Sequence, residues 1–179
     1  MIYADHAATT KISETAKLAM LSAMEKDWYN PSSLYTPGQQ ASGTLMDARV
    51  RIARCLGCLP KEIYFTSGGS EADNQAILSA AAIGKRQGKM HIISTAFEHH
   101  AVLHTLKKLE KEGFEITLLD VGEKGIVSPA QVEKAIRPDT ALVTVMYANN
   151  EIGTIQPIRE IGAVCRQNGV LFHTDAVQA

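Results

Sequence analysis

The sequence predicts an α/β protein in three layers, with helices covering both faces of a mostly parallel sheet. Along residues 62–179, short apolar and β-branched runs such as HIIS at 91–94 and ALVTVM at 141–146 alternate with amphipathic stretches of helical spacing. This alternation is typical of βαβ units, whose strands are buried on both faces. A chain of 179 residues, 45% of them hydrophobic, is long enough to enclose such a core.

Two helices are expected before the alternation begins. Apolar residues at helical spacing predict helices at Ser13–Lys26 and at Gln39–Leu56, separated by a loop dense in Asn, Pro, Ser and Gly. The elements predicted after them are a strand at Glu62–Thr66, a turn opening into a helix over 67–88, strands at 91–94, 114–119, 141–146 and 170–173, and helices at 101–112, 129–136 and 158–168.

The end of the sequence predicts that this sheet is incomplete. Residues 175–179 follow directly on an apolar strand, with no further helix and no polar tail. A sheet that stopped there would leave an edge strand without its neighbour. We therefore expect the chain to be part of a longer protein.

Charge and hydropathy argue against several classes of protein. A formal net charge of −1 with no basic run gives no indication of a nucleic-acid partner. No apolar stretch approaches the roughly 20 residues of a membrane span, and the N-terminus lacks the pattern of a secretory signal. We expect a cytoplasmic protein that binds neither nucleic acid nor membrane.

The cysteines do not predict a metal or redox site. Cys55 and Cys58 form a C-x-x-C motif, which could be a redox pair or half of a zinc site. No second such motif and no paired histidine lies near them in the sequence, whereas Gly57 suits the end of a helix. We interpret both cysteines as small buried hydrophobic residues, as we do Cys165 in its helical run, and expect no metal ligands.

Polar clusters follow the predicted strands, at the end of the sheet where α/β proteins bind ligands. The clusters are Ser67–Glu71, Glu98–His100, Asn149–Gly153 and His173–Gln178. Each cluster alone is weak support for a site. Four clusters at one end of one sheet predict one.

The segment TSGGSEADN predicts a seat for a phosphate group. Gly68 and Gly69 permit a close backbone approach, and the helix that follows presents free N–H groups and the positive end of its dipole. Ser70 is expected to cap this helix and to offer its hydroxyl. The alternative is an ordinary N-cap without a ligand.

The other clusters supply groups suited to a flat, charged ligand. Asp175 follows an apolar strand, so its carboxylate needs a partner such as a protonated ring nitrogen, with a helix cap or salt bridge as alternatives. His99 could stack on an aromatic ring and exchange protons, or could be structural. The amides of Asn149, Asn150 and Gln178 could bond a phenolic oxygen or a carboxylate, or could only form turns.

Together these residues resemble the cysteine desulfurases, a branch of the fold-type-I pyridoxal-phosphate enzymes in the aminotransferase class-V superfamily. The resemblance is carried in order by YADHAATT, NPSS, EIYFTSGGSEADN, EHHAV, NNEIG and HTDAVQ. EHHAV and NNEIG are most similar to the branch that serves nitrogen fixation and iron–sulfur-cluster assembly. The resemblance implies that residues 36–179 are an incomplete cofactor-binding large domain, and that residues 1–35 pack with a small domain.

The resemblance also implies roles for the site residues. Gly69 and Ser70 would hold the phosphate of pyridoxal 5′-phosphate, and His99 would stack on its ring and transfer protons. The remaining roles fall to Asp175 at the ring nitrogen, Gln178 at the phenolic oxygen, and Asn150 near the cofactor and the substrate carboxylate. The implied reaction converts L-cysteine to L-alanine and passes the sulfur as a persulfide to an acceptor or scaffold protein, in a homodimer.

One departure from the family pattern limits what these 179 residues can do. The Schiff-base lysine, the persulfide-forming cysteine and the arginine that binds the substrate carboxylate would all come after the last residue. We therefore expect no desulfurase turnover from this chain alone. The alternatives are another enzyme of the superfamily (a selenocysteine lyase, kynureninase or aminotransferase) and a non-catalytic scaffold that keeps part of the fold.

Overall fold

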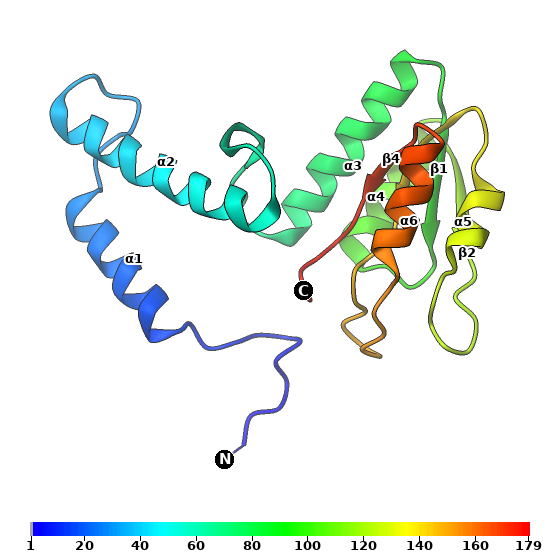
Figure 1. Cartoon of the computed structure of the whole chain (residues 1–179), viewed down its shortest axis with the longest axis horizontal. Coiled ribbons are helices and arrows are strands. Elements are labelled where there is room, and N and C mark those ends of the chain that lie inside the picture. Colours follow the sequence, from blue (N-terminus) through cyan, green and yellow to red (C-terminus); the bar gives the residue numbers. More distant parts are fainter. Residues whose placement is uncertain (1) are drawn as a thin grey trace. The chain divides into compact units, whose positions relative to one another are not determined.

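The computed structural model describes residues 2–179, which divide into two compact units (Figure 1). The first unit ends at Phe65, and the second covers Thr66–Ala179. The resemblance implies that residues 1–35 pack with a small domain, and this stays a prediction. The elements are α1 (Glu14–Lys26), α2 (Thr36–Leu56), the 3-10 turn η1 (Pro60–Glu62), α3 (Gly69–Arg86), β1 (His91–Thr95), α4 (His100–Lys111), β2 (Glu115–Leu119), α5 (Pro129–Ala135), β3 (Thr140–Thr144), α6 (Ile158–Gln167) and β4 (Leu171–His173).

The two helices of the first unit begin and end near the predicted residues. The side chain of Ser13 caps α1 by accepting a hydrogen bond of 3.2 Å from the Ala16 N–H. Helix α2 ends at Gly57, whose φ of 68° is the left-handed conformation that glycine adopts at helix ends. No helix among residues 2–179 is both long and apolar enough to cross a membrane.

The strand predicted at Glu62–Thr66 is wrong. Pro60 opens η1, and Glu62 closes it by accepting the Leu59 N–H at 2.7 Å. The residues that follow pair with no other strand in the described part of the chain, and Tyr64 is 74% exposed. An apolar, β-branched run becomes a strand only where another strand is present to take up its backbone hydrogen bonds.

The interpretation of the cysteines is confirmed in part. Cys165 is fully buried in the core, as expected, and burial raises the pKa of its thiol to about 11. Cys55 is exposed and Cys58 half-buried, so the expectation of two buried residues is wrong for Cys55. Among residues 2–179, no group of three or more His, Cys, Asp or Glu side chains is arranged to hold a metal ion.

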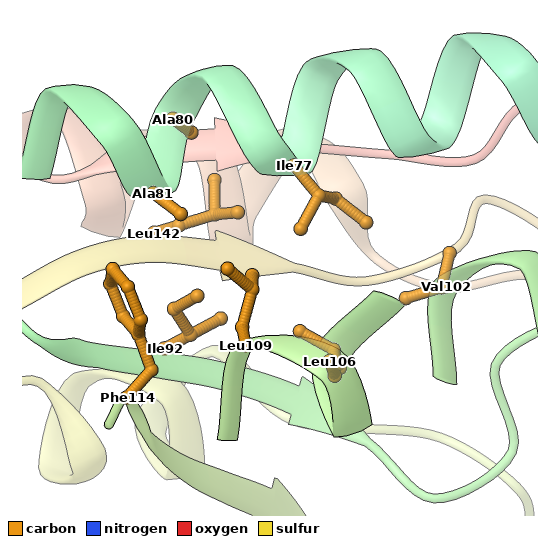
Figure 2. Packing of buried hydrophobic residues seen from close by; sticks show 9 residues of the cluster. All are labelled: Ile77, Ala80, Ala81, Ile92, Val102, Leu106, Leu109, Phe114 and Leu142. Carbon is orange, nitrogen blue, oxygen red and sulfur yellow. The ribbon is translucent and has the colours of Figure 1, made fainter. Parts of the chain in front are cut away.

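The second unit contains a four-stranded parallel sheet in the order β2-β1-β3-β4. Successive side chains of a strand point to opposite faces of the sheet. Both faces therefore carry apolar side chains, and helices cover both. Ile92 and Leu142 pack against residues of α3 and α4. Figure 2 shows this cluster, in which Ile77 is the residue from the middle of α3. Ile93 pairs with Val143 on the other face, in the cluster that includes residues of α5 and α6. The predicted three-layer α/β/α fold is confirmed.

A buried histidine joins three strands at the amino ends of the sheet. The ring of His91 lies 2.8 Å from the Thr140 hydroxyl through Nδ1 and 2.8 Å from the Thr117 hydroxyl through Nε2. Desolvation, assisted by the positive charge of Arg137, lowers the pKa of His91. The neutral ring therefore satisfies polar groups of β2 and β3 at once, which fixes the register of both strands against β1.

Removing one partner of this ring is expected to destabilise the second unit. Thr117→Val leaves the His91 Nε2 without a partner and should lower the free energy of unfolding by about 1–2 kcal/mol. Urea unfolding near pH 7.5 measures the change. Thr117→Ser keeps the hydroxyl and is the control, so an equal loss in both variants would contradict a role for the hydrogen bond.

Candidate functional site

The site lies at the carboxyl ends of the strands, where the segments after β1, β3 and β4 meet. Two hollows open there, of about 390 Å³ and about 330 Å³. Ser70 and His99 line the first hollow, and Glu98, His99, Asn149 and Asn150 line the second. His99 belongs to both, so the structure brings three of the four predicted clusters to one edge of the sheet.

The fourth cluster reaches the same place through a close contact with α3. A Cβ atom added at Gly69 would lie 2.6 Å from Cγ2 of Val177. Real Cβ atoms do not tolerate such a distance, so a larger residue would force the Val177 side chain or its segment, which carries Asp175 and Gln178, to shift. Gly69, which was predicted to allow a close backbone approach, therefore does so toward Val177 of the same chain.

The first turn of α3 differs from the prediction in its cap. Gly68 occupies the N-cap position and Ser70 lies inside the first turn, so Ser70 does not cap the helix. Instead, the Ser67 N–H and hydroxyl both donate to Glu71 Oε2 at 2.6 Å, and these bonds lower the pKa of Glu71. Within residues 2–179 the first N–H groups of the helix have no side-chain acceptor, so they can serve an anion.

Asp175 is a buried carboxylate with no cationic partner in the described part of the chain. Its side chain is 7% exposed, and Oδ1 accepts only the Val177 N–H, at 3.0 Å. Among residues 2–179 it makes no ion pair, so the salt-bridge alternative does not describe this structure. The backbone carbonyl of Asp175 accepts the Tyr147 N–H at 2.8 Å, which ties the segment to the end of β3.

A polar chain that the sequence did not suggest lies next to Asp175. His173 Nδ1 is 2.8 Å from the Thr144 hydroxyl, and His173 Nε2 is 3.5 Å from Asp73 Oδ1. Asp73 belongs to α3 and is 4% exposed. The contacts connect α3, β3 and β4 just before the site segments begin. An acidic residue on the inner face of a helix, followed far along the chain by a histidine in an apolar strand, is the only signal the sequence offered.

His99 is the N-cap residue of α4. Its Nδ1 accepts the Ala101 N–H at 3.1 Å, although the ring is exposed. Because Nδ1 acts as an acceptor, the neutral ring carries its proton on Nε2. His99 therefore has the structural role that was one alternative, as the cap of α4. This role uses Nδ1 and leaves Nε2 available to a ligand.

The three amides occupy different environments. Asn149 is buried and shapes the loop, since its Oδ1 accepts the N–H groups of Glu151 and Ile152 while its Nδ2 donates to the Phe97 carbonyl. Asn150 is exposed beside it in the second hollow. Gln178 is half-buried, three residues after Asp175.

Glu98 is a further residue of the site that the sequence analysis named only as part of a cluster. It is 4% exposed, and its Oε1 accepts the Thr95 hydroxyl at 2.7 Å and the Met146 N–H at 3.0 Å. Its Oε2 is buried and has no hydrogen-bond partner among the residues that the structure describes. Burial raises the pKa of Glu98 to about 7; the negative charge of Asp175 also raises it, against the two hydrogen bonds. The sequence signal was a glutamate between a predicted buried strand and a helix.

The raised pKa of Glu98 predicts how stability changes with pH. The unfolded chain ionises this carboxyl near pH 4.5, whereas the folded chain holds the proton to about pH 7. The folded state therefore binds more protons between these values, and the contribution of Glu98 to stability falls as pH rises through this window, by about 3 kcal/mol in total. Glu98→Gln removes the titration, so the variant should gain stability over the wild type between pH 5 and pH 8.

Urea unfolding of both proteins across this pH range tests the prediction. The difference between wild type and variant is the quantity to follow, because His91, Glu115 and Asp139 also titrate with shifted pKa values. Glu110→Gln changes an exposed glutamate and serves as the control. A difference that stays constant with pH would contradict a buried, proton-holding Glu98.

The residues present fit pyridoxal 5′-phosphate. Its phosphate is an anion that suits the uncapped N–H groups of α3, and its protonated ring nitrogen is a cation that suits the unpaired carboxylate of Asp175. The Gly69–Val177 contact brings these two features close together. His99 lines the hollow that contains Ser70, where it could lie against a ring.

Comparison with known proteins agrees with this description. The family model for aminotransferase class-V proteins matches residues 2–179. The putative cysteine desulfurase IscS 1 of Bacillus subtilis (strain 168) is 51% identical over 178 residues, which are 99% of this chain and 47% of that protein. The cysteine desulfurase IscS of Methanosarcina thermophila is 50% identical, over 99% of this chain and 44% of that protein.

Solved structures share the fold over nearly the whole chain. A NifS-like protein matches with a TM-score of 0.93 and 36% identity, covering 98% of this chain and 48% of its own. DndA from Streptomyces lividans matches with a TM-score of 0.88 and 38% identity, covering 99% of this chain and 50% of its own. The chain spans about half the length of the curated relatives it matches. It belongs to the aminotransferase class-V family, whose model it matches from residue 2 to residue 179.

Proposed function

We propose that this chain is the cofactor-seating part of a pyridoxal-phosphate-dependent cysteine desulfurase. The observation that carries the proposal is the buried carboxylate of Asp175, which has no cationic partner among residues 2–179 and lies on the segment that contacts the uncapped start of α3. The relatives named as cysteine desulfurases, at 50% and 51% identity, support the same reaction class.

Each residue of the site acts on a different part of the cofactor in this proposal. The N–H groups of the first turn of α3, at Gly69 and Ser70, bind the phosphate together with the Ser70 hydroxyl. The Asp175 carboxylate holds the ring nitrogen protonated, which makes the bound ring an electron sink for the substrate. His99 lies against the ring and moves a proton at Nε2, the nitrogen that its cap leaves available.

The remaining roles concern the substrate and the longer protein. Gln178 bonds the phenolic oxygen of the cofactor, and Asn150 lies near the carboxylate of L-cysteine. The product is L-alanine, and the sulfur leaves as a persulfide for an acceptor or scaffold protein of iron–sulfur-cluster assembly. The complete enzyme is a homodimer in the cytoplasm, in which residues 1–35 pack with a small domain and the lysine that binds the cofactor covalently lies outside the present sequence.

Binding of pyridoxal 5′-phosphate tests the seat directly. Equilibrium dialysis of the purified chain should show saturable binding, and Asp175→Ala should weaken it about 10- to 100-fold, because it removes a charge-assisted hydrogen bond. Asp120→Ala is a matched control: Asp120 also follows a strand and also accepts an N–H two residues ahead, from Gly122 at 2.9 Å. Equal effects of the two substitutions would contradict the proposed role of Asp175.

Turnover by the isolated chain should be absent. The chain with added pyridoxal 5′-phosphate should convert L-cysteine to L-alanine no faster than the free cofactor does, since the lysine, the cysteine nucleophile and the substrate-binding arginine of the family have no counterpart here. Alanine formation is followed by chromatography, with a full-length relative as the positive control. Production above the free-cofactor rate would overturn this part of the proposal.

A further inference from the structure

The loop that carries His99 is held to the end of β3 by two hydrogen bonds. The Met146 N–H donates to Glu98 Oε1 at 3.0 Å, and Asn149 Nδ2 donates to the Phe97 carbonyl at 3.0 Å. The partners are 48 and 52 residues apart in sequence, so neither bond is part of a local turn. We call these four residues the loop clasp.

The loop clasp limits where the His99 ring can lie. Glu98 and Phe97 immediately precede His99, and the His99 carbonyl accepts the N–H groups of Val102 and Leu103 in α4. The ring itself is held on the helix side by the bond between Nδ1 and the Ala101 N–H. His99 is therefore fixed by α4 on one side and by the loop clasp on the other. A shift of the clasp would move the ring relative to both hollows that it lines.

A carboxyl group in the clasp makes its strength depend on a proton. An amide oxygen would accept the same two hydrogen bonds without titrating. Glu98 instead buries a second oxygen, Oε2, that no group in the described chain satisfies. Ionisation would shorten the bonds to the Thr95 hydroxyl and the Met146 N–H. Burial nevertheless raises the pKa of Glu98 against both bonds, so the closed loop clasp favours the protonated carboxyl and loss of the proton loosens it.

The charges around Glu98 come from three elements. His173 lies in β4 and Asp175 lies just after it. Burial and the charge of Asp175 raise the pKa of Glu98, whereas the charge of His173 lowers it. His173 in turn lies 3.5 Å from Asp73 of α3. His99 is the titratable neighbour on the same loop.

We infer that Glu98 is a positioning residue for His99, and that the proton on its carboxyl sets how firmly the loop clasp holds the His99 ring. The inference rests on the proposed function only in taking His99 as the residue that faces the cofactor. Glu98 itself touches neither the cofactor nor the substrate in this scheme. It acts through the backbone of the loop.

Nuclear magnetic resonance of the 179-residue chain without cofactor tests the inference. The Met146 amide resonance should move with a midpoint near pH 7, where Glu98 ionises. The protection of the Ala101 amide from hydrogen exchange, taken relative to Glu98→Gln so that other titrating groups cancel, should fall with the same midpoint, because that amide is held only while the His99 ring keeps its capping position. In Glu98→Gln the Met146 profile should be flat with the cap retained.

A second variant separates positioning from mere presence of the side chain. Glu98→Ala removes the acceptor and should lower the protection of the Ala101 amide about tenfold, the scale of one lost hydrogen bond, whereas Glu98→Gln should restore it. Glu110→Gln, on the exposed face of α4, should behave as the wild type. Should Glu98→Ala not fold, the pH profiles of wild type and Glu98→Gln decide the matter without it.

The contrary results are equally specific. A Met146 resonance that titrates while the Ala101 protection does not would show a clasp that leaves His99 unaffected, and would overturn the inference. So would a Glu98→Gln protein that keeps the wild-type profiles. Because no cofactor is present, these readouts stand apart from the dialysis experiment: failure of the wild type to bind pyridoxal 5′-phosphate contradicts the proposed function, while the Met146 and Ala101 signals decide the role of Glu98.

Discussion

The parallel pairing of β1 with β3 is the constraint on which the candidate site depends. Ile92 and Ile93 of β1 lie opposite Leu142 and Val143 of β3, so the two strands end at the same edge of the sheet. The segment that leaves β1 carries Glu98 and His99, and the segment that leaves β3 carries the amides of residues 149 and 150. A slip of one residue would turn the core side chains of one strand to the opposite face, and would shift the segment that follows that strand relative to its neighbour. The core residues therefore position the site as well as stabilise the sheet.

The charges buried beneath the site are not balanced. Asp73, Glu98 and Asp175 are each at most 7% exposed. His173 lies near Asp73, and two hydrogen-bond donors serve Glu98, but Asp175 receives a single backbone N–H. Burying a carboxylate with so few partners destabilises the fold. A ligand that brings a positive charge to Asp175 would offset this cost and would also lower the pKa of Glu98, so binding at one residue is coupled to the proton on the other.

Sequence periodicity predicted the layers of the second unit because burial on both faces leaves a strong pattern. Strands such as β1 and β3 are buried at every position, and the helices between them carry apolar residues at helical spacing. The strand expected at 62–66 failed because pairing depends on a partner that lies elsewhere in the chain. The N-cap of α3 was expected at Ser70 but lies two residues earlier, at Gly68, because glycine and serine both suit the start of a helix. Glu98 was overlooked as a site residue because its partners, Thr95 and Met146, meet it only in the folded chain.

The cofactor seat and the two N-terminal helices differ in what stabilises them. Helix α1 buries none of its residues, and its Leu18 and Met24 are 58% and 65% exposed. A helix of 13 residues is marginal in water without packing, so α1 would gain stability from an apolar surface to pack against. All the proposed cofactor-binding residues belong to the second unit, which has its own core on both faces of the sheet. The proposed seat thus lies in the unit that can hold its geometry, and the exposed apolar face of α1 supports the proposal that residues 1–35 pack with a domain of the longer protein.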